Sequence, residues 1–211
     1  MKPKMRVGML LMLAASLATG TVAAQPYPSR AIRLIVPLAP GGPSDILARS
    51  MGQKLSESMK QAVLVDNRTG AGGTLGTDLA AKSAPDGYTM LLVAVATYTI
   101  NAGLYPKLPY DPHKDLTPVT ILAGAPYILV VHPALPVRTV KQLIALAKAR
   151  PGELNYSSGG AGTGPHLATE VFKANAGINV VHIPYKGAGP ALNDLVAGQV
   201  HVVLIFQIQD I

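Results

Sequence analysis

Four glycine-rich segments hold the residues most suited to bind a ligand: residues 40–45, 69–74, 158–164 and 184–190. Each is expected to leave a strand and enter a helix. Because glycine has no Cβ, a ligand can approach the backbone closely there, and the free N–H groups in the first turn of a helix carry a partial positive charge. One such loop is usually only a tight turn, but four in succession favour an anion site made of backbone amides.

Nucleotide-binding motifs are incomplete in these loops. Gly70, Gly72 and Gly76 approximate the dinucleotide fingerprint, but the third glycine stands one position late and no acidic residue ends a strand about 20 residues further on. No glycine-lysine-serine or glycine-lysine-threonine sequence occurs, so the phosphate loop of the nucleoside triphosphatases is missing. We therefore expect no cofactor.

The side chains that could catalyse a reaction do not form a set. Ser157 and Ser158 lack the flanking glycines of a nucleophile elbow. His166 and Glu170 stand four residues apart, a spacing that could hold a metal on one helix face, but no second histidine-rich element completes the ligands. The chain has no cysteine, which excludes a thiol nucleophile. We expect no catalytic residue and no metal, with an exported α/β enzyme as the alternative from another class.

The composition indicates a folded protein with many turns. Of the 211 residues, 49% are hydrophobic and 14% are charged, which excludes a mainly disordered chain. The 21 glycines and 18 prolines are too many for a helical bundle. The formal net charge is +7, but the basic residues form no stripe with interleaved aromatic residues, so we expect no nucleic-acid partner.

The first 24 residues have the three-part pattern of a secretory signal peptide. Three basic residues within the first six precede an apolar run of 12 residues at 7–18, and small residues precede Gln25. This run is well short of the roughly 20 residues that a membrane-spanning helix needs. We expect cleavage between Ala24 and Gln25 and export to a bacterial periplasm, which fits a chain without cysteine.

Strands and amphipathic helices alternate along the rest of the chain. The expected strands lie at residues 32–36, 63–65, 89–95, around 119–121, 127–132, 154–158, 180–183 and 200–205, and the expected helices at 44–60, 75–83, 140–150, 165–176 and 188–197. Because the strands are apolar on both faces, they should form mainly parallel sheets that helices cover on both sides. The fold class is therefore α/β.

Four prolines interrupt the periodic pattern at residues 105–118, and we place the crossover between two α/β lobes near there. The predicted organisation is a signal peptide at 1–24, a first lobe at 25–122 and a second lobe at 123–211. The second lobe is counted as incomplete, because no helix follows its last strand to cover it.

An ordered series of short motifs extends over residues 25–203. The motifs lie within residues 27–45, 67–73, 85–89, 104–111, 131–133, 154–158, 166–168 and 182–187. Together they resemble the Bug family of periplasmic receptors, the substrate-binding components of tripartite tricarboxylate transporters. Each motif alone is weak, but the ordered series is highly specific.

The resemblance implies a periplasmic-binding-protein fold of the type II topology, whose two lobes close by hinge motion on a small carboxylate without catalysis. Di- and tricarboxylates, amino acids and aromatic acids all suit such a site. The implied partners are this ligand and the membrane permease subunits of the transporter. The receptor would act as a monomer in uptake or in sensing.

The same resemblance implies which residues hold the ligand, mainly through backbone amides and partly through ordered waters. In the first lobe they are Ala39, Gly41, Gly42, Asp45, Ala71, Gly72 and Gly73. In the second lobe they are Ser158, Gly159, Gly160, Ala161, Gly162, Thr163 and Tyr185.

Two features depart from the family pattern. After Val200 the family has an aromatic and an acidic residue that reaches the ligand, whereas this sequence has Leu204 and Ile205, or Phe206 and Gln207 if the register shifts. Family members also continue well beyond the position of Ile211. These departures favour a truncated or frameshifted product, and they leave open the alternative of a remnant that binds nothing and melts without cooperativity.

Overall fold

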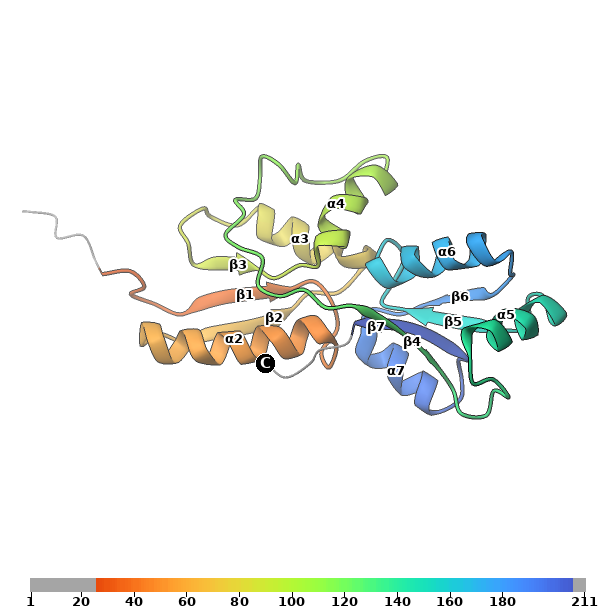
Figure 1. Ribbon diagram of the computed structural model, residues 1–211. Helices are drawn as coiled ribbons and strands as arrows, with labels where there is room; N and C mark the ends of the chain where they lie inside the picture. Colours follow the sequence, from red (N-terminus) through yellow and green to blue (C-terminus); the bar gives the residue numbers. More distant parts are fainter. Residues whose placement is uncertain (1–25, 207–211) are drawn as a thin grey trace, which may run out of the picture.

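The computed structural model describes residues 26–206, which form two α/β lobes side by side (Figure 1). The expected signal peptide and its cleavage site lie outside the described residues. Within residues 26–206, no helix has the length and apolar character needed to cross a membrane. The alternating strands and helices confirm the α/β class.

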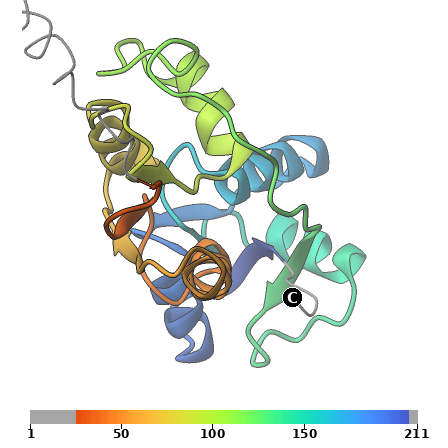
Figure 2. The same ribbon diagram turned by 90° about the vertical axis from the view of Figure 1, so that its left-hand side faces the viewer.

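The first lobe is built on a parallel sheet with the strand order β2-β1-β3. Its elements are β1 (Ile32–Val36), α2 (Pro43–Met59), β2 (Val63–Asn67), the 3-10 helix η1 (Ala71–Gly73), α3 (Thr74–Ala81), β3 (Thr89–Leu91) and α4 (Val95–Leu104). Helix α2 lies on one side of the sheet, and α3 and α4 lie on the other (Figure 1 and Figure 2). Leu34 and Val36 pack against Ala48 of α2, and Ile32 and Ile35 are fully buried as well, which explains the apolar sequence of β1.

The second lobe is built on a sheet with the strand order β4-β7-β5-β6, in which only β4 and β7 pair antiparallel. Its elements are β4 (Tyr127–Val131), α5 (Val140–Ala149), β5 (Asn155–Ser158), α6 (Gly164–Ala176), β6 (Val181–Pro184), α7 (Ala188–Val196) and β7 (Val202–Phe206). Leu143 of α5 packs with Tyr156 and Val202 on one face of this sheet. Leu195 of α7 packs with Val203 on the opposite face.

The last strand is covered, so the expectation of an uncovered one is wrong. Strand β7 lies inside the second sheet, between β4 and β5. Val202 is 4% exposed and Val203 is 2% exposed, each beneath helices that precede β7 in the sequence. Counting helices along the chain failed because the order of strands in the sheet differs from their order in the sequence.

Helix α4 replaces part of an expected strand. The strand expected over residues 89–95 ends at Leu91, and Val95 already begins α4, for which no helix was expected. The inner face of this helix is polar, with Thr97 and Asn101 at most 2% exposed. An apolar periodicity therefore does not mark it in the sequence.

No strand forms at the expected residues 119–121. Val119 and Ile121 are 81% and 78% exposed, and neither belongs to a strand of the described chain. Their β-branched side chains favour an extended backbone, but a strand also needs a neighbour for its hydrogen bonds. The segment lies in the long connection, residues 105–126, that leads from the first lobe to the second.

Candidate functional site

A small cavity with a volume of about 40 Å³ lies between the lobes. The first turns of four helices contribute to it, and the N-terminal ends of α2, α6 and α7 meet between the two sheets in Figure 1. The residues that line it are Leu38, Ala39, Gly42, Pro43, Ser44, Asp45, Ala94, Thr97, Gly159, Thr163, Gly164, Pro165 and Ala188. This described lining contains no lysine and no arginine, so the helix N-termini are the groups in it that carry a partial positive charge.

Glycines and prolines make these helix starts possible. Gly42 precedes Pro43 at the first position of α2, and Thr163 precedes Gly164 and Pro165 at the start of α6. Proline is favourable in a first turn because its missing N–H would have no partner inside the helix. Small residues also let the lobes approach closely: a Cβ on Gly42 would lie 3.4 Å from the Cβ of Ala188.

The loop that leads from β1 into α2 is held by the carboxylate of Asp45. Its Oδ2 atom accepts hydrogen bonds from the Gly41 amide and from Nε of Arg49, each at 3.0 Å. Burial opposes the charged form, but the hydrogen bonds from Arg49 and Gly41 hold the pKa of Asp45 below its usual value. The second oxygen, Oδ1, is buried and has no partner among the described residues. Asp45 is among the residues that line the cavity, and Oδ1 is buried behind this lining.

The loop that leads from β5 into α6 is held by neutral groups. The Ser158 hydroxyl lies 2.7 Å from Nε2 of His182 and accepts the Gly160 amide at 3.1 Å. The Gly162 amide donates to Nδ1 of His166 at 3.3 Å. The Thr163 hydroxyl donates to the Gly160 carbonyl oxygen at 2.7 Å. Side chains of the second lobe, those of Ser158, Thr163 and His166, therefore form hydrogen bonds with the backbone of this loop.

Some of the amides expected to bind a ligand are free, and others already have a partner. Among the described residues, the amides of Gly42, Gly159 and Ala161 have no hydrogen-bond partner. The Ala39 amide donates across the cleft to the Lys186 carbonyl oxygen at 2.8 Å. This hydrogen bond joins the two lobes at one end of the cavity.

The expected residues Ala71, Gly72 and Gly73 do not line the cavity. They form η1, which contacts the second-lobe loop directly. Gly160 of that loop lies against Gly72, and a Cβ on Gly72 would lie 2.0 Å from the Ala161 carbonyl oxygen. The Tyr105 hydroxyl lies 3.4 Å from the carbonyl oxygens of both Ala71 and Ala161. These residues join the lobes beside the cavity.

The expected residue Tyr185 lies outside the cavity lining. Its hydroxyl donates to Oδ2 of Asp194 on α7 at 2.5 Å, and its ring packs in the apolar cluster beneath that helix. Burial and the hydrogen bond to the Asp194 carboxylate raise the pKa of Tyr185 to about 12, so the hydroxyl stays protonated. In this structure Tyr185 therefore holds α7 against β6.

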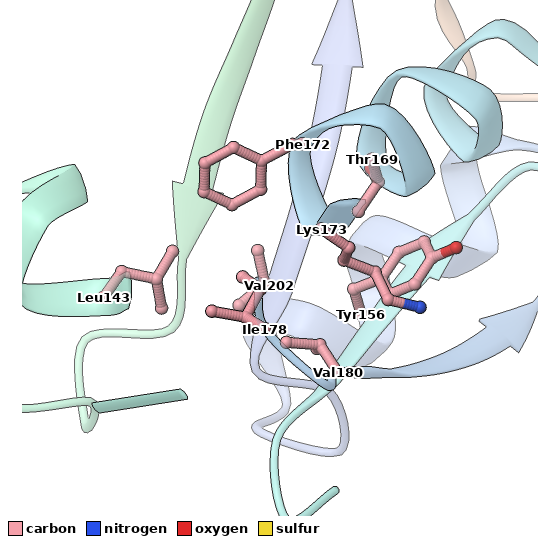
Figure 3. Close-up of a pocket in the computed structure, with 8 residues that line it drawn as sticks. All are labelled: Leu143, Tyr156, Thr169, Phe172, Lys173, Ile178, Val180 and Val202. Carbon is pink, nitrogen blue, oxygen red and sulfur yellow. The ribbon is translucent and has the colours of Figure 1, made fainter. Parts of the chain in front are cut away.

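A second cavity, of only about 10 Å³, lies inside the second lobe (Figure 3). Its lining is Leu143, Tyr156, Thr169, Phe172, Lys173, Ile178, Val180 and Val202. It is no larger than a single water needs and is mainly apolar. We interpret it as a packing gap between α5, α6 and the sheet.

Thr97 and Ala94, which belong to the start of α4, were not expected in the site. Ser44 and Ala188 lie within the glycine-rich segments 40–45 and 184–190, and the prolines at the starts of α2 and α6 mark those helix starts. Nothing comparable marks α4. Across residues 26–206, no group of three or more histidine, aspartate and glutamate side chains is placed to hold a metal ion.

The sequence has clear relatives. The pattern that defines the family described as "Tripartite tricarboxylate transporter family receptor" matches residues 47–209. Protein BugT of Bordetella pertussis is 45% identical over 180 residues, which cover 85% of this chain and 55% of BugT. The chain thus spans little more than half the length of this relative.

Two solved structures of Rhodopseudomonas palustris proteins share the fold. Rpa4515, solved with adipate, is 39% identical with a TM-score of 0.82, and MatC, solved with bound malate, is 31% identical with a TM-score of 0.81. The matches cover 85% of this chain and 60% and 61% of those chains. They confirm the expected periplasmic-binding-protein fold.

Proposed function

The chain belongs to the tripartite tricarboxylate transporter receptor family, and we propose that it binds a small carboxylate in the cleft between its lobes. The protein acts in the periplasm, passes its ligand to membrane permease subunits or signals its presence, and catalyses no reaction. The ligands in the names of two similar structures, adipate and malate, support a dicarboxylate.

The observation that carries this proposal is the chemistry of the cavity wall. First turns of four helices converge on one space, and the amides of Gly42 and Gly159 are free there. Such amides stabilise a carboxylate by hydrogen bonds and by the helix dipoles, without fixed cations. We assign the direct contacts to Gly42, Gly159 and Thr97, whereas Thr163 uses both of its donors to hold the Gly160 carbonyl oxygen.

The remaining predicted residues support the site indirectly. Gly72 lies against Gly160 and Ala161 where the lobes meet, and Gly162 lies against Asn101 of α4. Gly41 and Ser158 fix their loops. The cavity volume of about 40 Å³ holds little more than one water, whereas ligand pockets typically measure about 300–1,000 Å³. A dicarboxylate therefore enters only when the lobes separate, and closure then encloses it.

The free oxygen of Asp45 restricts the ligand further. An ionised carboxylate repels a second one unless a donor lies between them. The ligand therefore presents a hydroxyl or ammonium group to Oδ1 of Asp45, or an ordered water fills that place. A hydroxyl-bearing dicarboxylate such as malate satisfies both the amides and Asp45.

The test is a thermal melt of the chain with malate, adipate and a tricarboxylate, each compared with its uncharged amide. A ligand at a hundredfold its Kd adds about 2.7 kcal/mol to the free energy of unfolding. We expect a carboxylate to raise Tm and its amide to have no effect. A Tm that no carboxylate raises would contradict the proposal and favour the alternative of a remnant that binds nothing.

Two matched variants place the binding in the cleft. Thr97→Val removes a cavity hydroxyl while keeping the side-chain shape, and Thr99→Val makes the same change on the exposed side of α4. We expect Thr97→Val to raise Kd by about 2- to 10-fold, the value of one hydrogen bond, and Thr99→Val to leave Kd unchanged. Equal Kd values for both variants would place the ligand elsewhere.

A further inference from the structure

Two histidines that are far apart in the sequence meet beneath the second-lobe loop. His166 of α6 and His182 of β6 have ring centroids 4.4 Å apart, and the Tyr156 ring of β5 stacks on His182 at 4.7 Å. Both histidines are half-buried. Lys173 lies over the Tyr156 ring, with Nζ 5.3 Å from its centroid (Figure 3).

The two histidine rings each hold one end of the loop 158–163. His182 contacts the Ser158 hydroxyl, which in turn accepts the Gly160 amide. His166 accepts the Gly162 amide at Nδ1. A ring nitrogen can accept a hydrogen bond only while it carries no proton, so the contact to Gly162 requires a neutral His166 with its proton on Nε2.

Burial keeps both rings neutral although the Glu170 carboxylate acts in the opposite direction and raises the pKa of each ring. Glu170 faces them from α6, but its Oε1 already accepts Nζ of Lys173 at 2.7 Å and the Tyr156 hydroxyl at 2.6 Å. Burial lowers the pKa of His166. Burial and the neighbouring His166 lower the pKa of His182 to about 4. A proton on one ring therefore disfavours a proton on the other, and the two titrate as a coupled pair.

We propose that His166 and His182 are positioning residues that hold the loop 158–163 in its binding conformation, and that protonation of His166, which the coupled pair resists, releases the Gly162 end of this loop. The consequence for ligand affinity rests on the proposed function, whereas the movement of the loop does not. A proton on Nδ1 of His166 would face the N–H of Gly162, so two donors would oppose each other and the loop would move away.

Movement of the loop 158–163 would also change its contact with the first lobe. Ala161 lies between Gly160 and Gly162, and its carbonyl oxygen contacts Tyr105 and the Gly72 segment of the first lobe. Release of the loop therefore removes the contact that joins the lobes beside the cavity. Acid would weaken closure as well as the amide site.

The first experiment follows the ligand-free chain by NMR from pH 8 to pH 4. We expect the Gly162 amide resonance and the His166 ring resonances to shift together, with a midpoint below the 6.5 of an ordinary histidine. The Ile32 amide, which donates to the Ala62 carbonyl oxygen in the first-lobe sheet away from this loop, is the internal reference and should not share this midpoint. A Gly162 amide that stays unchanged while His166 titrates would overturn the proposal.

The second experiment measures the Kd for malate at pH 7.5, 5.5 and 4.5. The variants are His166→Asn, whose Oδ1 can accept the Gly162 amide without titrating, and His113→Asn, which changes an exposed histidine of the connection between the lobes. We expect the Kd of the unmodified chain and of His113→Asn to rise by up to about tenfold per pH unit below the midpoint. The Kd of His166→Asn should rise less, since only the ionisation of malate itself then remains.

The outcomes separate the two proposals. Equal pH profiles for the unmodified chain and His166→Asn would overturn the role of His166. If malate binds at no pH while Gly162 and His166 still titrate together, the proposed function fails and the positioning role stands. The NMR titration needs no variant, so it decides the matter even if a variant does not fold.

Discussion

The two loops on either side of the cavity present the same backbone chemistry but are held by different side chains. In the first lobe, the ionised Asp45 binds the Gly41 amide and pairs with Arg49. In the second lobe, the neutral rings of His166 and His182 hold Gly162 and Ser158. One loop therefore depends on a charge being present, and the other depends on charges being absent.

Because of this difference, the two loops should lose stability at different pH values. The folded state lowers the pKa of Asp45 below 3.8, so its contribution to stability is present above that value and is lost only as the pH falls through the folded pKa. The folded state also lowers the histidine pKa values, to about 4 for His182. The contribution of the neutral rings to stability is therefore complete above pH 6.5 and declines as the pH falls from 6.5 towards 4. Mild acid should release the second-lobe loop first.

The largest expected effect comes from the point where the loops of the two lobes touch. In Gly72→Ala, the new Cβ would lie 2.0 Å from the Ala161 carbonyl oxygen, which is backbone and cannot turn aside. Overpacking of this kind costs about 1–3 kcal/mol, so we expect the Kd for malate to rise by about 5- to 150-fold. Isothermal titration calorimetry would measure it.

Gly177→Ala is the matched control for Gly72→Ala. Gly177 has φ +62, close to the +60 of Gly72, but nothing lies within 4 Å of the position of its Cβ. Both variants carry the same backbone strain of about 1–2 kcal/mol, so both should lower Tm. Only Gly72→Ala should lose affinity, and an equal loss in both would show that strain, not the contact between the lobes, is responsible.

Removing the charge that holds the first-lobe loop should have the next largest effect. Asp45→Asn loses the ion pair with Arg49 and weakens the bond from the Gly41 amide, so we expect the free energy of unfolding in urea to fall by about 1–2 kcal/mol at pH 7. The loss should disappear when the pH falls through the pKa of Asp45. Glu57→Gln removes an exposed charge from the same helix and should change little; a similar loss there would contradict the assignment.

A smaller and pH-limited effect is expected in the second lobe. His182→Gln places an amide near the position of Nε2, so it can keep the contact to Ser158 without becoming charged. The unmodified chain should lose Tm between pH 6.5 and pH 4 because the unfolded state binds protons that the folded pair rejects. The variant should lose less Tm over this range. Parallel curves for the two proteins would show that other groups cause the acid sensitivity.

The smallest effect should come from removing a cation next to the cleft. Lys186 contributes its backbone carbonyl oxygen to the contact with Ala39, and its side chain is not part of the cavity lining. If amides and helix dipoles neutralise the ligand, Lys186→Ala should change Kd by less than about threefold. A much larger loss would mean that a fixed cation binds the carboxylate.

Much of the fold could be predicted from the sequence because burial leaves a periodic pattern. Strand β1 was predicted at its observed bounds, since helices bury both faces of its apolar residues. Helix α4 could not be predicted, because its buried residues Thr97 and Asn101 are polar. The strand expected at 119–121 is absent because propensity alone supplies no pairing partner.

Part of the cavity lining could be predicted as well. The loops around Gly42 and Gly159 are recognisable from glycines between a strand and a helix, and both line the cavity. Tyr185 matches the same family motif, yet its hydroxyl bonds to Asp194. A motif identifies the loop, whereas the direction of a side chain depends on the element that packs against it.

The sequence alone determined the α/β class, the glycine-rich loops between strands and helices and the resemblance to carboxylate receptors, because local backbone chemistry and burial are visible in residue types and spacing. Only the tertiary structure decided that four helix starts share one cavity, that β7 lies inside its sheet and that His166 meets His182. These facts depend on contacts between residues that are distant in the chain. No local pattern records such contacts, since strand order and lobe packing are set by the whole fold.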